Sequence, residues 1–385
     1  MFVPLLVLRN AFRHRLRTTL TVIGIIVAIA AFGLLRTIVD AWYSGANASS
    51  SARLVTRSSV SLVFSLPLTY AQKIRQVPGV SSVAWANWFG GVYVTERNFF
   101  AQFAMSGASY LDMYPEFVLS DAERKAFLAD RVGAIAGRKL ADKYGWKVGD
   151  QIPIRGTIYP GTWTFTLRGI YDGAETGTDT STFFFHFDYL NETIKRLFPR
   201  RADQAGVFIE RLRDPEDAAA VSQAIDATFR NSLAETLTET EKAFQLGFAA
   251  MSEAILLAIQ AVSYVVIVII MAVMANTMAM TARERYAEYA TFKALGFSNG
   301  FVAMLIFAES LGIAILGGLL GVAFTFPIAD AFAKSVGSIL PAFQVSETTI
   351  AIQVAAALVI GIVAAAIPAW NAARIRIVDG LRAIG

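Results

Sequence analysis

The side chains most able to do chemistry are scarce in this chain and are not grouped. It has two histidines, His14 and His186, which a candidate membrane-spanning run separates, and no cysteine. The lack of cysteine excludes disulfides, thiolate metal sites and a cysteine nucleophile. Neither histidine has a second ligand at metal-site spacing, and we find no nucleophile elbow and no catalytic carboxylate pair. We therefore predict no catalytic site and no metal site.

Two segments near the middle of the chain each allow two interpretations. Asp172, Glu175 and Asp179 form an acidic loop rich in Gly and Thr, which fits weak cation binding or a solvated turn. His186 lies in the aromatic run 183–187, which fits an apolar contact for a lipid or a partner, or a buried strand. For both segments we favour the structural interpretation.

Four long apolar runs dominate the sequence on either side of these residues. Hydrophobic residues make up 55% of the 385 residues and charged residues 17%, which is more apolar than a soluble domain. A helix needs about 20 apolar residues to cross a bilayer. Runs of this length occupy residues 18–38, 254–280, 301–333 and 350–370.

We therefore predict a membrane α-helical fold with four transmembrane helices and an inserted α+β domain outside the cytoplasm. The first run also resembles a signal peptide, but it is longer than a usual signal core. The predicted division is a cytoplasmic N-terminal segment 1–17, transmembrane helix 1 at 18–41, the extracytoplasmic domain 42–247, helix 2 at 248–282, a cytoplasmic segment 283–297, helix 3 at 298–333, an external loop 334–349, helix 4 at 350–371 and a cytoplasmic tail 372–385.

Basic residues give the orientation of these helices. The loop 334–349 carries one lysine, whereas the flanks predicted to lie on the other side carry Arg9, Arg13, Arg15, Arg17, Arg283, Arg285, Lys293, Arg374, Arg376 and Arg382. By the positive-inside rule, we expect both termini to be cytoplasmic. We also expect a multi-pass protein of the inner (cytoplasmic) membrane, whose outer side is either a periplasm or a Gram-positive exterior. Because the cations cluster beside apolar runs, the net charge of +4 does not indicate a nucleic-acid partner.

Within the inserted domain, the pattern predicts helices at 66–76, 122–129 and 138–144 and strands at 80–94, 163–171 and 207–211. Asp214 and Pro215 are typical of a helix start, and that helix is expected to end near Asn231. A Ser/Ala-rich stretch at 44–52 is typical of a flexible tether.

The segment 283–297 is the most informative in the sequence. It predicts a short amphipathic helix with Lys293 near its C-terminal end and Gly296 as its stop. Tyr286, Tyr289 and Phe292 are expected to be exposed on it. Those aromatics fit a docking surface for a cytoplasmic partner, or an interfacial helix resting among lipid headgroups.

The end of this segment, Lys-Ala-Leu-Gly-Phe, resembles the coupling-helix signature of the MacB/FtsX/LolCE family of ABC-transporter permeases. Glu309 lies where many members carry a glutamate in the third helix. Gly380 departs from the family's usual alanine. Further segments similar to the family are 10–24 before and into the first helix, 132–150 in the inserted domain, and 368–374 and 379–382 at the C-terminal end.

The resemblance implies a mechanotransmission permease that is not itself an enzyme. Such a chain forms a homodimer or pairs with a paralogous permease, and it binds a cytoplasmic ABC ATPase that carries ATP and Mg²⁺. This chain has no Gly-x-x-x-x-Gly-Lys-Ser/Thr motif, so it is expected to bind no cofactor. The coupling residues that the resemblance implies are Arg283, Glu284, Arg285, Tyr286, Glu288, Tyr289, Phe292, Lys293 and Gly296.

Two functions are compatible with this reading. The complex either exports or extracts a lipid, lipoprotein, peptide or hydrophobic compound, or it is an FtsX-like signalling complex that controls a cell-wall hydrolase. An inserted domain of this size favours the first function. A periplasmic adaptor is a further candidate partner, and membrane lipids surround the helices.

Four residues inside the apolar runs are candidates for helix packing or dimer formation. Gly317 and Gly321 form a Gly-x-x-x-Gly pair, which fits a dimer face or packing inside one subunit. Glu309 is an intramembrane carboxylate, expected to act as a structural anchor or in coupling. It could form a hydrogen bond near the interface or to Asn276.

Overall fold

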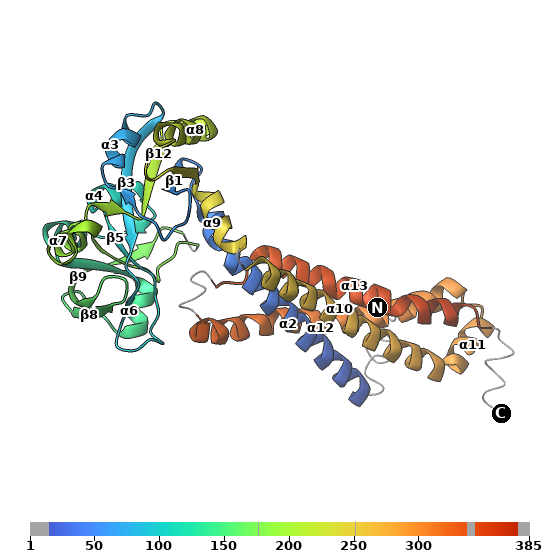
Figure 1. Ribbon diagram of the computed structural model, residues 1–385. Helices are drawn as coiled ribbons and strands as arrows, with labels where there is room; N and C mark the ends of the chain where they lie inside the picture. The colour runs from blue at the N-terminus through green and yellow to red at the C-terminus, as the bar shows by residue number, and fades with distance from the viewer. Residues whose placement is uncertain (1–14, 176, 251, 337–342, 376–385) are drawn as a thin grey trace. The chain divides into compact units, whose positions relative to one another are not determined.

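A computed structural model describes residues 15–175, 177–250, 252–336 and 343–375 (Figure 1). The described residues form two compact units. One consists of residues up to Asp40, Glu253–Ser335 and those from Phe343 onward, and the other is Ala41–Ser252. The predictions for Arg9, Arg13, His14, Arg376, Arg382, Gly380 and most of the segments 1–17 and 372–385 lie outside the described residues.

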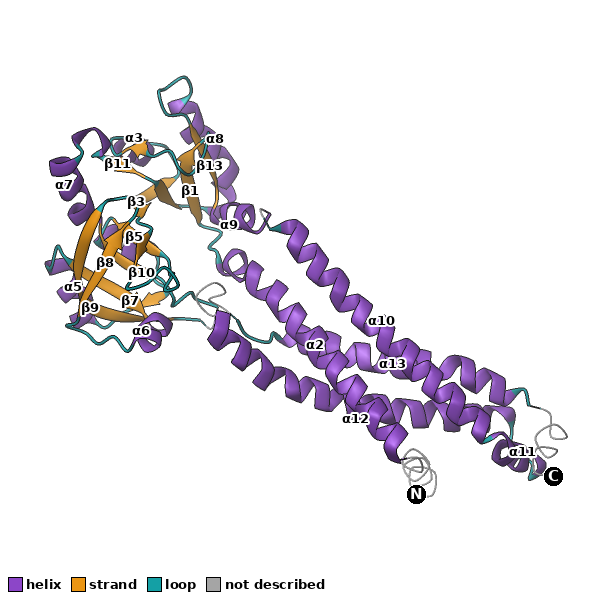
Figure 2. Ribbon diagram, turned by 60° about the horizontal axis from the view of Figure 1, so that its bottom comes forward, coloured by secondary structure: helices purple, strands orange, loops and turns teal. Residues whose placement is uncertain are grey.

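The helical unit contains four long helices that run alongside one another (Figure 2). Its elements are α2 (Arg15–Ala48, of which the residues after Asp40 belong to the other unit), α10 (Glu253–Glu284), the short α11 (Tyr286–Ala294), α12 (Asn299–Val336) and α13 (Glu347–Ala373). Four candidate spans, Arg15–Ala46, Glu253–Glu284, Asn299–Ala333 and Glu347–Ala373, are long and apolar enough to cross a membrane. The predicted four-helix membrane fold is confirmed.

Helix α2 continues beyond the predicted end of the first span. The expected tether at 44–52 is instead helical as far as Ala48, although it contains Gly45, which disfavours a helix. Ser44 donates to the carbonyl of Ala41, and Ser49 donates to that of Gly45. A Cβ on Gly45 would lie 3.4 Å from Gln245 of α9 (Glu241–Ala250), so this part of α2 packs against a second helix.

The glycine pair of α12 packs against α2 of the same chain. A Cβ on Gly317 would lie 2.8 Å from the Ile25 side chain, and one on Gly321 would lie 2.8 Å from Ile29. Ile25 and Ile29 are fully buried in the helical core. The structure therefore supports the packing interpretation of this motif and gives these two positions to a contact inside one chain.

Enlarging Gly317 should destabilise the helical unit. We expect Gly317→Ala to lower the free energy of unfolding by about 1–3 kcal/mol, because the added methyl group overlaps Ile25. Gly312→Ala is the matched control on the same helix: no described heavy atom lies within 4 Å of its Cβ position, so this change should be neutral or stabilising. Thermal unfolding of both variants in nanodiscs tests this, and equal melting temperatures would contradict it.

The inserted domain is built on one mixed sheet. Its strands lie in the order β13-β1-β12-β3-β5-β10-β7-β9-β8-β4, with β6 paired to β9. The pairs β5/β10 and β7/β9 are parallel and the other pairs are antiparallel. The strands are β1 (Arg53–Ser58), β3 (Val80–Trp88), β4 (Gly91–Val92), β5 (Gln102–Met105), β6 (Phe117–Val118), β7 (Gly133–Gly137), β8 (Gln151–Gly156), β9 (Gly161–Gly173), β10 (Phe183–His186), β12 (Val207–Leu212) and β13 (Thr236–Thr240).

Short helices cover this sheet and enclose three apolar cores. A separate two-stranded sheet joins β2 (Leu66–Pro67) to β11 (Gln204–Ala205). The helices are α3 (Tyr70–Arg75), α4 (Ala108–Met113), α5 (Asp121–Ala129), α6 (Arg138–Tyr144), α7 (Phe187–Leu197) and α8 (Ala218–Phe229), with 3-10 turns η1 (Pro199–Arg201) and η2 (Pro215–Asp217). The predicted inserted α+β fold is confirmed.

Most of the predicted local elements match. The helix at 138–144 coincides with α6, and β9 and β12 contain the strands predicted at 163–171 and 207–211. Asp214 accepts a hydrogen bond from the Glu216 amide, as a helix-capping residue does, but it begins η2 before α8 starts. The helix expected at 66–76 instead begins with two residues of β2, because Leu66 and Pro67 pair with β11.

The two ambiguous central segments have structural roles. His186 is buried in β10, and its Nε2 lies 2.7 Å from the Phe127 carbonyl. Burial lowers the pKa of His186, so it is neutral at pH 7. In the acidic loop, Asp172 pairs with Arg138, and Asp179 accepts bonds from Ser181 and Thr182. No metal-binding group of three or more ligands occurs in the described part of the chain.

Candidate coupling site

Helix α11 is a separate short helix at one end of the helical unit (Figure 2). It begins after Arg285, where α10 has ended, so Arg283 and Glu284 belong to the last turn of α10. At its other end Gly296 has φ of 91°, which suits glycine. The Gly296 amide bonds to the carbonyl of Lys293 and the Phe297 amide to that of Phe292, the Schellman pattern. The predicted stop at Gly296 is present.

A buried ion pair joins the start of α11 to α12. The guanidinium Nη1 of Arg285 lies 2.7 Å from Oε2 of Glu309, and both side chains are about 95% buried, with 5% and 4% exposed. Nε of Arg285 also bonds to Glu288 at 2.9 Å, and its guanidinium lies 5.3 Å from the Tyr289 ring. Burial lowers the pKa of Arg285, but these partners outweigh burial and raise it above its ordinary value. Arg285 therefore stays charged.

The other end of α11 is fastened to α13. The Lys293 ammonium donates to the carbonyls of Ala373, at 2.7 Å, and Ile375, at 2.9 Å. These carbonyls lie at the C-terminal end of α13, where a helix leaves acceptors unpaired and favours a cation. α11 is thus held at both ends.

The last turn of α10, just before α11, is joined to α2 as well. Nη1 of Arg17 lies 2.8 Å from Oε2 of Glu284, and Nη2 lies 2.8 Å from Oε1. This bidentate arrangement fixes orientation better than a single contact does. The segment around α11 is thus connected to every long helix of the unit. It follows α10 in the chain, bonds to α12 and α13, and is linked to α2 through the last turn of α10.

The expectation of exposed aromatics on α11 is wrong for Tyr289. Tyr289 is 1% exposed and lies in the helical core, and burial raises its pKa to about 12. Tyr286 and Phe292 are partly buried against the same core. A short helix between two spans packs against the ends of those spans, and the apolar aromatics are the side that packs.

The exposed apolar groups of this segment follow the helix. Leu295 is 71% exposed and Phe297 is 45% exposed. Phe297 also stacks on Phe301 with ring centroids 4.6 Å apart, so it is partly structural. Leu295 was missed from the candidate residues; its place beside the Gly296 stop, outside the predicted apolar face, is the signal that could have found it.

The remaining candidates fall into two groups. Glu309 serves α11 by pairing with Arg285, and its suggested bond to Asn276 is not formed. Asn276 is exposed on α10 and is not part of the site. Gly317 and Gly321 lie on α12 against α2, as described above.

In comparison with known proteins, this chain matches two protein-family models. A MacB-like periplasmic core domain covers residues 18–228, and an FtsX-like permease C-terminal region covers residues 261–377. An uncharacterized ABC transporter permease of Methanocaldococcus jannaschii is 21% identical over 97% of this chain and 96% of its own length. An uncharacterized ABC transporter permease protein of Mycobacterium tuberculosis is 25% identical over 52% of this chain, and the match spans only 22% of that protein.

Two solved domain structures are also similar to part of this chain. The extracellular domain of the noncanonic ABC-type transporter YknZ from Gram-positive bacteria covers 49% of this chain and 100% of its own, with 11% identity and a TM-score of 0.36. The periplasmic region of MacB from Actinobacillus actinomycetemcomitans covers 52% and 94%, with 7% identity and a TM-score of 0.37. With a MacB-like core domain matching more than half of its length and an FtsX-like region following it, this chain belongs to the MacB/FtsX-like family of ABC transporter permeases.

Proposed function

We propose that this chain couples ATP hydrolysis by a separate cytoplasmic ATPase to movements of its inserted domain. In this proposal the complex exports or extracts a lipid, lipoprotein, peptide or hydrophobic compound at the outer face of the inner membrane. One observation carries the coupling role: α11 is held at both ends by Arg285 and Lys293, while Leu295 beside it is exposed. A helix fixed at both ends, with an exposed apolar side chain beside it, is suited to pass movement of a bound ATPase to the membrane helices.

The orientation in the membrane supports the same proposal. Arg15, Arg17, Arg283 and Lys293 flank the helices at the end of the unit that carries α11. By the positive-inside rule this end and both termini face the cytoplasm, where ATP is available. The ATP and Mg²⁺ would be held by the ATPase. A second copy of this chain, or a paralogous permease, would complete the assembly.

The docking role of Leu295 can be tested directly. We expect Leu295→Asp to weaken binding of the ATPase by about 10- to 100-fold, because burying a leucine contributes roughly 1.5–3 kcal/mol. Leu295→Met is the matched control, since it keeps apolar area at the same position. The affinity of the co-purifying ATPase for each variant in nanodiscs is the measurement, and equal affinities for Leu295→Asp and wild type would rule out docking there.

The identity of the partners decides between transport and signalling. The tagged full chain is purified gently from its native host, and the recovered proteins and lipids are identified by mass spectrometry. An ATPase recovered with an adaptor, a lipoprotein or a lipid supports a transporter. An ATPase recovered with a cell-wall hydrolase favours signalling instead, and recovery of no ATPase would contradict the coupling proposal.

A further inference from the structure

The two chain segments that connect the inserted domain to the membrane helices meet at one place in that domain. The first segment is the end of α2 followed by β1, and the second is β13 followed by α9, which precedes α10. β1 and β13 pair directly, with Leu54 opposite Thr240. The ends of α2 and α9 are also neighbours at Gly45 and Gln245. Any relative movement of the two segments therefore acts on this pair of strands.

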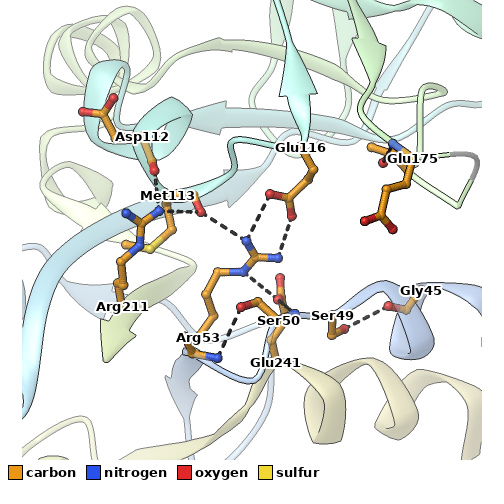
Figure 3. Close-up of polar contacts among 12 residues, drawn as sticks. Gly45, Ser49, Ser50, Arg53, Asp112, Met113, Glu116, Glu175, Arg211 and Glu241 are labelled. Carbon is orange, nitrogen blue, oxygen red and sulfur yellow. Dashed lines mark hydrogen bonds and ion pairs between the residues drawn. The ribbon is translucent and has the colours of Figure 1, made fainter. Parts of the chain in front are cut away.

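Arg53, the first residue of β1, is buried between these segments and a turn of the domain (Figure 3). Its Nε donates to Oε2 of Glu241, the first residue of α9, at 2.7 Å. The same Glu241 oxygen accepts from the Ser50 amide at 3.1 Å. Glu241 is thus bound by both the backbone and the side chain of the segment that leads into β1.

The other nitrogens of Arg53 reach the turn 113–116, which joins α4 to β6. Nη2 and Nη1 bond to the two carboxylate oxygens of Glu116 at 2.6 Å and 3.2 Å, and Nη1 also bonds to the Met113 carbonyl at 3.1 Å. The guanidinium lies 4.3 Å from the Tyr114 ring. Arg211 of β12 donates to the same Met113 carbonyl at 3.0 Å. One guanidinium therefore joins both connecting segments to this turn.

From this turn the contacts continue into the opposite half of the sheet. Phe117 of β6 pairs with Gly173 of β9, and the Ala174 amide bonds to the Glu116 carbonyl at 2.9 Å. In the sheet order, five strands lie between β1 and β9. The Arg53 contacts thus connect β1 to β9 through the turn 113–116 and β6, without passing through the intervening strands.

The physical chemistry of this cluster makes it stiff. Arg53 and Glu241 are each 7% exposed in their side chains, so water does not replace their contacts. Burial by itself lowers the pKa of Arg53, but Glu116 and Glu241 outweigh it, and the guanidinium stays charged. A planar guanidinium holds several acceptors in fixed directions, whereas a lysine ammonium provides a single flexible point charge.

We propose that Arg53 is the positioning residue that fixes both membrane-connected segments to the turn 113–116, so that their movement is passed to the β6–β9 side of the sheet. This inference rests on the proposed coupling function. It also predicts what a loss of the cluster does: the helices still respond to ATP, but the far half of the inserted domain does not follow.

The test uses the full chain with its co-purified ATPase in nanodiscs and Mg·ATP. Because the chain has no cysteine, spin labels attach only at cysteines introduced for the purpose. Unlabelled chain is added so that labels on different chains are far apart. One label pair, at exposed Lys125 of α5 and Lys242 of α9, reports on the inserted domain. A second pair, at Val27 of α2 and Val268 of α10, reports on the membrane helices. Double electron–electron resonance gives both distances with and without nucleotide.

We expect ATP to shift both distances in the wild type. Arg53→Lys should retain the shift between the membrane helices and lose the shift within the domain. Glu116→Gln, a nearly isosteric change on a partly exposed side chain, should do the same if Arg53→Lys fails to fold. Arg57→Met is the matched control, because it removes an ion pair of another β1 arginine, to Glu239 of β13 at 3.0 Å, without touching the turn. It should retain both shifts.

The outcomes separate this inference from the proposed function. If the domain shift persists in Arg53→Lys and Glu116→Gln, or is lost equally in Arg57→Met, the role of Arg53 is overturned. If the wild-type helices move but the domain does not, the inference fails and the coupling at the helices stands. If the wild-type helices do not respond to ATP, the proposed function fails and this inference fails with it.

Discussion

Replacing Arg285 by methionine should lower the free energy of unfolding by about 3–5 kcal/mol, because it leaves Glu309 buried without its partner. Glu309→Leu should cost a similar amount, since Arg285 would then lose its buried carboxylate. The double change Arg285→Met with Glu309→Leu should recover much of the loss, because no buried charge remains uncompensated. Thermal unfolding of the full chain in nanodiscs measures all three variants.

An exposed pair on the same helical unit provides the control. Arg17→Met removes a bidentate contact to Glu284. The Arg17 and Glu284 side chains are 27% and 36% exposed, and exposed ion pairs contribute about 0–1 kcal/mol to the free energy of unfolding. An equal loss for Arg17→Met and Arg285→Met would mean that burial of the Arg285–Glu309 pair is not important. The double variant also separates stability from coupling: it should recover much of the lost stability, yet transmit ATP-driven movement poorly because the ion pair no longer anchors α11 to α12.

The membrane helices could be predicted from the sequence because their signal is long and local. Runs of about 20 apolar residues have few alternatives, and the structure has spans near each predicted one. In α11 the local signal was not sufficient. Its tyrosines suited a docking face and a packing face equally well, and Tyr289 became buried because the ends of three long helices converge there. Tertiary packing decided which face is exposed.

The contacts of Arg285 and Arg53 could not be predicted for a related reason. Arg285 looked like an orienting cation, and its partner Glu309 is on another helix. Arg53 opens a strand, while its partners Glu116 and Glu241 lie far away in the sequence. A single sequence has no period or spacing that indicates such pairs. The sequence did indicate the Gly317 and Gly321 pair. It could not tell which contact the pair makes, because the same pattern occurs at helix contacts inside one chain and between chains.

A second large effect is expected at Glu210 of β12, a carboxyl group buried in the inserted domain. Glu210 is 0% exposed and lies on the same face of the strand as Phe208 and Leu212, which belong to an apolar core. Neither carboxylate oxygen has a hydrogen-bond partner among the described residues. Burial raises the pKa of Glu210 to about 8; the Thr56 hydroxyl opposes this rise, and the Asp226 carboxylate adds to it. In the unfolded chain the pKa returns to its ordinary value near 4.5.

This difference makes the stability of the inserted domain depend on pH. The folded state holds the proton more tightly than the unfolded state, so the stabilisation is complete below about pH 4.5 and is lost as the pH rises through 8. Between pH 5 and 8 the loss is about 4 kcal/mol, from roughly 1.4 kcal/mol for each pH unit. Glu210→Gln, which is neutral at every pH, should remove this dependence and should be clearly more stable than the wild type at pH 8.

Urea unfolding of the full chain at several pH values measures the effect through the fluorescence of Trp85, Trp88, Trp146 and Trp163. Glu216→Gln, at an exposed turn, is the control and should keep the wild-type pH profile. If the wild type and Glu210→Gln lose stability in parallel from pH 5 to 8, Glu210 is not the group that titrates. If instead the two variants converge at pH 5 and separate at pH 8, the domain carries a buried carboxyl group that is mostly protonated at neutral pH. Its ionisation would then weaken the packing of β12 beside β1, the strand that begins with Arg53.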